Sequence, residues 1–140
     1  LLDFPRYKEW HAGFINYIET NPPDKPASSL VKGDTLRAGF SGTNLQPTIT
    51  NNTPIELRWF GSWKASAFAG EQYFGFEESK ITPMAMTFIH GEKYTAWLSM
   101  LFKPGWPLHS SLNAMYTQFA QDLKARVEAN RKEDRSPNAS

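Results

Sequence analysis

The strongest constraint on the fold of this chain is a change in the spacing of its apolar residues near position 110. From residue 110 to about residue 131, apolar side chains recur at intervals of three and four, which places them on one face of a helix. Ser110 or Ser111 can cap the start of this helix by accepting a hydrogen bond from a free backbone N–H group. The spacing predicts one long amphipathic helix with an apolar face made of Leu112, Met115, Tyr116, Phe119, Leu123 and Val127.

Before residue 110 the pattern is typical of β-strands. In residues 54–60 (PIELRWF), Ile55, Leu57 and Trp59 share one face, and charged residues occupy the positions between them, as in a half-buried antiparallel strand. Residues 95–102 continue apolar, either as a further strand or as an irregular lip. We expect about six strands, at residues 13–19, 35–41, 46–50, 54–60, 70–78 and 84–94.

The connections follow from the distribution of proline, glycine and small polar residues. Residues 1–4 read as the end of a helix that stops before Pro5, and residues 6–11 as a loop. Residues 20–33 contain three prolines and are predicted to be an exposed loop, and residues 42–44 are predicted to be a turn.

A sheet and a helix that each carry one apolar face bury both faces when the helix packs on the concave side of the sheet. We therefore expect an α+β fold in which a curved antiparallel sheet grips a long C-terminal helix. A chain of 140 residues has the size of one domain, so residues 1–132 are predicted to form a single ligand-binding domain and residues 133–140 a frayed tail. Space between a curved sheet and its helix is a natural site for a small molecule.

Composition excludes several classes of function. Charged residues make up 21% of the chain and nearly cancel to a net charge of +1, so nucleic acid is not an expected partner. The absence of cysteine excludes disulfides and thiolate chemistry and is compatible with either redox environment. No apolar stretch is long enough to span a bilayer, and residues 1–10 do not resemble a signal peptide. We expect a cytoplasmic monomer or homodimer.

Several segments together resemble the START/Bet v 1-like (SRPBCC, helix-grip) superfamily, and within it the branch of polyketide cyclases and dehydrases. The resemblance covers nearly the whole chain. Members begin with a strand before the first of the segments below, and this chain lacks one, so the first strand of the fold is expected to be missing. The segments that carry the resemblance are residues 3–10 (DFPRYKEW), 56–61 (ELRWFG), 74–77 (FGFE), 88–94 (FIHGEKY), Met115, Phe119, residues 123–124 and residues 126–128.

The resemblance implies that the chain binds a small hydrophobic molecule in an internal cavity. It further implies catalysis of an aldol-type or pericyclic cyclisation in secondary metabolism, without a cofactor. The alternative is a non-catalytic carrier or sensor of a lipid, quinone or hormone-like ligand. No metal is expected, because His11 and His109 lie in loops and lack a partner at metal-ligand spacing.

His90 and Glu92 are the candidate catalytic residues. Two positions apart on a strand, they share a face with Phe88 and Tyr94, so all four side chains point into the cavity if Phe88 does. A carboxylate beside a histidine favours the protonated ring, and such a pair can act as a general acid or base near neutral pH. The alternative is a structural polar pair under the helix.

Aromatic residues are abundant, with ten Phe, five Trp and five Tyr. Such side chains either fill a core or line a pocket for an apolar ligand. Most are expected to be core. Arg58 is expected to face solvent. The candidate ligand-binding residues are Trp59, Phe74, Phe76, Phe88, Tyr94, Trp97, Met100, Met115, Tyr116 and Phe119.

Overall fold

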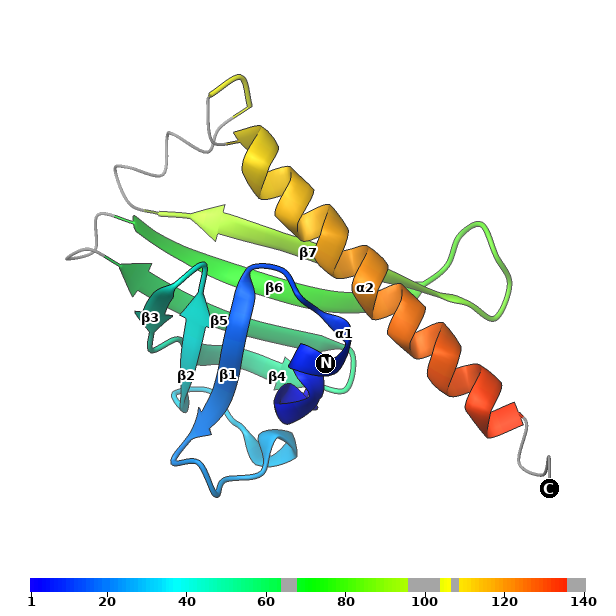
Figure 1. Ribbon diagram of the computed structural model, residues 1–140, viewed down its shortest axis with the longest axis horizontal. Helices are drawn as coiled ribbons and strands as arrows, with labels where there is room; N and C mark the ends of the chain where they lie inside the picture. The colour runs from blue at the N-terminus through cyan, green and yellow to red at the C-terminus, as the bar shows by residue number, and fades with distance from the viewer. Residues whose placement is uncertain (64–67, 96–103, 107–108, 136–140) are drawn as a thin grey trace.

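The computed structural model describes residues 1–63, 68–95, 104–106 and 109–135. It confirms the predicted α+β architecture: a curved, unclosed antiparallel sheet followed by one long helix, α2 (Figure 1). Among the described residues the sheet has seven strands, in the order β1-β2-β4-β5-β6-β7 with β3 paired to β2. The elements are η1 (Phe4–Arg6), α1 (Tyr7–Trp10), β1 (Ile15–Asn21), η2 (Ala27–Ser29), β2 (Thr35–Phe40), β3 (Thr43–Leu45), β4 (Thr48–Thr53), β5 (Glu56–Trp63), β6 (Phe68–Glu78), β7 (Met86–Tyr94) and α2 (His109–Arg135).

The turn expected at residues 42–44 is shorter than predicted. Ser41 and Gly42 have positive φ angles of 48° and 80°, as in a two-residue hairpin turn. Because two residues complete the turn, Thr43 already pairs with Phe40, and Thr43–Leu45 form β3. The expectation of about six strands therefore missed one short strand.

The alternation predicted for β5 holds within the strand and fails just before it. Leu57 and Trp59 are buried on the inner face of the sheet, whereas Ile55 is 59% exposed. Ile55 lies in the tight turn between β4 and β5, where a side chain is not held to either face. Arg58 points to the outer face, where its guanidinium lies over the ring of Tyr73 at 5.4 Å from the centroid.

Helix α2 crosses the inner face of the sheet (Figure 1). Phe119 is fully buried at the centre of the contact, with its ring 5.8 Å from that of Phe74 on β6 and 6.3 Å from that of Phe88 on β7. Leu123 is also buried, but Val127 is 54% exposed. The C-terminal end of α2 projects beyond the strands (Figure 1), so the expected apolar face is used only in its first part.

Both ends of α2 differ from the predicted helix. The helix begins at His109, so Ser110 and Ser111 lie inside its first turn and neither precedes it as a cap. It continues to Arg135, which makes residues 133–135 part of the helix rather than of a frayed tail. Lys, Glu, Asp and Arg are tolerated in an exposed helix, and the first strong stop signal after residue 131 is Pro137.

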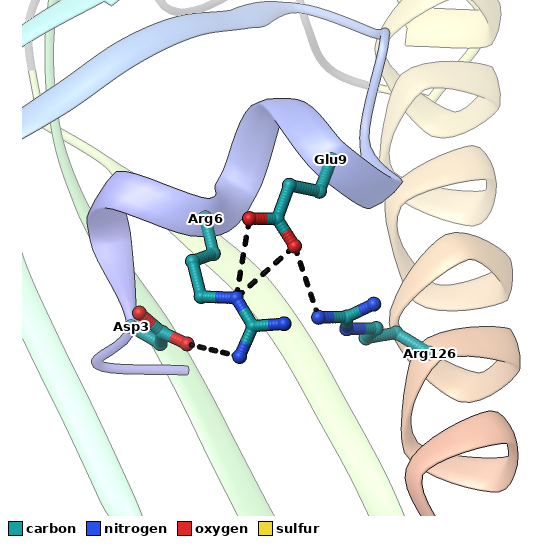
Figure 2. Close-up of polar contacts among 4 residues, drawn as sticks. All are labelled: Asp3, Arg6, Glu9 and Arg126. Atoms are coloured by element: carbon teal, nitrogen blue, oxygen red, sulfur yellow. Dashed lines mark hydrogen bonds and ion pairs between the residues drawn. The ribbon is translucent and has the colours of Figure 1, made fainter.

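The loop predicted for residues 6–11 is instead largely helical. Pro5 lies in the first turn of η1, where its missing N–H group costs nothing, and α1 follows directly. Figure 2 shows how ion pairs join this segment to α2: Glu9 accepts hydrogen bonds from Arg6 and, at 3.0 Å, from Arg126 of α2. Asp3 lies 3.6 Å from the Arg6 guanidinium.

A buried histidine forms a second link between the N-terminal segment and α2. His11 is 2% exposed, and its Nδ1 lies 2.8 Å from Asp122 Oδ2 on α2. The His11 ring also packs edge-on against Phe119, with centroids 5.0 Å apart. Gly13 is required beside it, because a Cβ atom at residue 13 would lie 2.4 Å from the imidazole.

Candidate functional site

A cavity of about 430 Å³ lies between the N-terminal half of α2 and one end of the sheet. Its size is in the range of small-molecule sites in proteins. Most of its wall is apolar, and the polar side chains are few. The lining residues are Phe14, Phe40, Ser41, Thr43, Leu45, Pro47, Trp59, Gly61, Ser62, Ala69, Gly70, Gln72, Glu92, Tyr94, Leu112, Met115 and Tyr116.

The cavity exists because two inward positions of the sheet carry no side chain. Gly61 of β5 pairs with Gly70 of β6, and both line the cavity. A Cβ atom at residue 61 would meet nothing within 4 Å. In the rows of paired residues further along, Trp59 and then Leu57 fill the same face. The pair of glycines therefore leaves the sheet bare where α2 passes over it.

Four side chains of the cavity, Trp59, Gln72, Tyr116 and Glu92, form a directed series of hydrogen bonds. Trp59 Nε1 donates to Gln72 Oε1 at 2.9 Å, and Gln72 Nε2 lies 3.5 Å from the Tyr116 hydroxyl as a weak donor. The Tyr116 hydroxyl in turn donates to Glu92 Oε2. Each donor in this series of hydrogen bonds points toward Glu92, whose carboxylate is the final acceptor.

Gly70 makes room for that carboxylate. A Cβ atom at residue 70 would lie 2.6 Å from Glu92 Oε1, so the Glu92 side chain lies across the bare backbone of β6. Burial raises the pKa of the Tyr94 and Tyr116 phenols above the ordinary value, and the charge of Glu92 raises both further. Both phenols therefore stay protonated at neutral pH and can act as donors.

His90 occupies a different environment from the one expected. Its ring stacks on Phe74 with centroids 4.4 Å apart and contacts Tyr116 at the same distance. Within the described part of the chain, neither ring nitrogen has a hydrogen-bond partner. Burial lowers the pKa of His90 to about 4, so the ring is neutral at pH 7.

The expected interaction between His90 and Glu92 is thus corrected. The two side chains do share the inner face with Phe88 and Tyr94, as predicted. However, Glu92 is hydrogen-bonded to Tyr116 rather than to His90 and does not favour the protonated ring. His90 is not among the residues that line the cavity. A catalytic role of either residue stays a prediction.

The other candidate residues divide between the cavity and the core. Trp59, Tyr94, Met115 and Tyr116 line the cavity. Trp97 and Met100 lie outside the described residues. The remaining four form an aromatic cluster beneath the second half of the contact between α2 and the sheet: Phe74, Phe76, Phe88 and Phe119.

Sequence reasoning missed the small and N-terminal residues of the lining. Gly61 and Gly70 carry the strongest signal that could have been used, since a glycine at an inward strand position leaves a gap in the packing. Phe14 and Phe40 come from segments with no distinctive motif, and their rings stack with centroids 6.0 Å apart. Their place in the lining depends on the three-dimensional arrangement of β1 and β2.

Comparison with known proteins gives no relative: no protein-family model, curated protein or solved structure matches this chain. Within the described residues, no helix combines the length and the apolar character that a bilayer crossing requires.

Proposed function

We propose that the chain binds a small hydrophobic molecule in the cavity between α2 and the sheet. The observation that carries the proposal is the paired glycines at residues 61 and 70, which leave a partly open hollow of about 430 Å³ between the helix and the sheet. Most of its wall is apolar, and water contacts that wall when the hollow is empty. A ligand of matching size removes this apolar surface from water.

A neutral fluorescent probe tests this proposal. N-phenylnaphthylamine brightens in an apolar environment, and we expect saturable binding to the purified protein. The substitution Gly61→Leu places an apolar side chain in the cavity, and its Cβ atom meets nothing within 4 Å. It should weaken probe binding by about tenfold or more, which corresponds to roughly 1.4 kcal/mol.

Gly75→Leu is the matched control. Gly75 lies on the outer face of β6, and its nearest neighbour to an added Cβ is the Ile55 carbonyl oxygen at 4.0 Å, an ordinary contact. This variant should bind the probe as the unmodified chain does. Equal binding by all three proteins would place the probe outside the cavity and contradict the proposal.

A proton-transfer reaction is the second candidate function, and Glu92 is the observation that favours it. The carboxylate could remove a proton from the carbon beside a ligand carbonyl. The enolate carbon would then attack a second carbonyl of the same molecule, and the resulting alkoxide would take the proton back from Glu92. This is an aldol-type ring closure, in which the cavity contributes by holding the reacting carbons together.

The hydrogen bond from Tyr116 weakens one argument for catalysis. It offsets part of the cost of placing a carboxylate in an apolar cavity, so Glu92 is also compatible with a carrier or sensor. A linear polyketone that binds the protein distinguishes the two functions. An enzyme should accelerate its cyclisation, and Glu92→Gln should lower that rate by about a hundredfold. Binding of the polyketone without faster cyclisation would support the carrier or sensor function.

A further inference from the structure

The charge of the cavity wall restricts which hydrophobic molecules can bind. Among the lining residues that the structure describes, Glu92 is the only one whose side chain carries a carboxyl, amino, guanidinium or imidazole group. Lys93, its neighbour in β7, is exposed on the opposite side of the strand. None of the ion pairs found among residues 1–63, 68–95, 104–106 and 109–135 includes Glu92. The described wall therefore presents a negative charge.

The carboxylate of Glu92 has capacity for a further donor. A carboxylate accepts about four hydrogen bonds through its two oxygens. Tyr116 donates one of them to Oε2. Tyr94 interacts with the same carboxylate and has a single O–H group to give. The two phenols together use at most about half of the acceptor capacity, and a ligand that brings an N–H or O–H donor can use the rest.

Aromatic rings surround the same space. The lining includes the rings of Phe14, Phe40, Trp59, Tyr94 and Tyr116. The negative faces of such rings attract an ammonium group and add to the attraction of a carboxylate. An anionic head group would meet repulsion from the carboxylate of Glu92. The carboxylate favours a cation, and a ring that turns its face to the cation adds to this preference.

We infer that the cavity selects a hydrophobic molecule that carries a protonated amine. This inference rests on the proposed function, since it specifies the ligand of the same cavity. The ammonium group is bound by Glu92, which lies over Gly70, and the apolar part of the ligand occupies the open space over Gly61. The Glu92 side chain lies across Gly70, so its carboxylate is next to the open space over Gly61.

Three ligands that differ only in the head group test this inference: decylamine, decanol and decanoate. Each is used below its solubility limit or critical micelle concentration to displace N-phenylnaphthylamine at pH 7. In the unmodified chain, we expect decylamine to bind about tenfold or more tightly than decanol, and decanoate to bind most weakly. This ranking needs no variant, so it holds as a test even if a substituted protein fails to fold.

Two variants then locate the source of the ranking. Glu92→Gln keeps the shape of the side chain and an oxygen that can accept the Tyr116 hydrogen bond, and it should make the amine and the alcohol bind equally. Glu71→Gln is the control, because Glu71 lies on the outer face of β6 and pairs with Arg58 at 3.6 Å. The control should keep the ranking of the unmodified chain.

The outcomes separate this inference from the proposed function. The inference is overturned if decanol displaces the probe and decylamine binds no more tightly than decanol, or if decanoate binds most tightly. In either case, the proposal that the cavity binds a hydrophobic molecule is retained. If the amine preference persists in Glu92→Gln, its source lies elsewhere and the inference is again overturned. If none of the three ligands displaces a probe whose binding is weakened by Gly61→Leu, the inference is overturned and ligand binding in the cavity is retained. If Gly61→Leu does not weaken binding of the probe, both proposals fall.

Discussion

At the scale of single residues, the site depends on two facing glycines that play different parts. Gly61 faces open space, whereas Gly70 lies under the Glu92 carboxylate. The same substitution therefore has different physical consequences at the two positions, and the pair serves as an internal comparison.

Gly70→Ala should lower the free energy of unfolding by about 1 kcal/mol, because the new methyl group displaces Glu92 from its packed position. Gly61→Ala should raise it by about 0.5 kcal/mol, since alanine restricts the unfolded chain and here meets no clash. Urea unfolding followed by tryptophan fluorescence measures both. Equal effects of the two substitutions would show that Glu92 does not lie across Gly70.

His90 makes stability depend on pH. Burial lowers its pKa in the folded chain to about 4, against 6.5 for the unperturbed side chain. Between these values the unfolded state binds the proton and the folded state does not, so protonation favours unfolding. The stability that depends on neutral His90 is complete above about pH 6.5 and is lost as the pH falls toward 4, by a total of about 3 kcal/mol.

His90→Phe should remove this dependence while keeping the stacking on Phe74. The difference in unfolding free energy between pH 7 and pH 4.5 should be about 2 kcal/mol smaller in the variant than in the unmodified chain. Urea titrations at the two pH values provide the comparison. An NMR titration that places the pKa of His90 near 6.5 would refute the account of its burial.

At the scale of elements, α2 is held by more than its apolar face. His11 and Asp122 connect it to the segment between α1 and β1. Asp122→Ala leaves a buried imidazole nitrogen without its partner and should cost about 2 kcal/mol. Asp122→Asn retains an oxygen acceptor and should cost less. Gln121→Ala, at the exposed neighbouring position, is the control, and a cost equal to that of Asp122→Ala would exclude a specific link.

The buried and exposed parts of the apolar face of α2 should differ in how much they contribute to the free energy of unfolding. Leu123 is buried and Val127 is 54% exposed on the same face. Leu123→Ala should destabilise the protein by about 3 kcal/mol, and Val127→Ala by less than about 0.5 kcal/mol. Thermal or urea unfolding checks both. A large cost at Val127 would mean that the end of the helix is packed in solution.

The main helix and strands were easier to predict than the residues at which they begin and end. A repeat of two in β5 and a repeat of three and four in α2 follow directly from which side chains must be buried, and both are found. The short helix α1 and the strand β3 were missed because Pro5 and Gly42 permit either a loop or a regular element. Tertiary pairing decides between them.

At the scale of the whole molecule, the site was predicted only in part. Burial on one strand face correctly grouped His90 with Glu92, but the partner of Glu92 comes from α2, more than twenty residues away. Sequence spacing carries no information on such a contact. The fold supplies the cavity, and the side chains at its wall supply the selectivity proposed for it.

The most direct test of ligand binding in the cavity uses the methionines as reporters. The chain has four, of which Met115 lines the cavity and Met84 and Met86 are exposed between β6 and β7 or at the start of β7. In protein labelled with ¹³C at the methionine methyl groups, added decanol should shift the Met115 resonance saturably and leave those of Met84 and Met86 in place. Shifts at Met84 and Met86 with none at Met115 would contradict binding in the cavity.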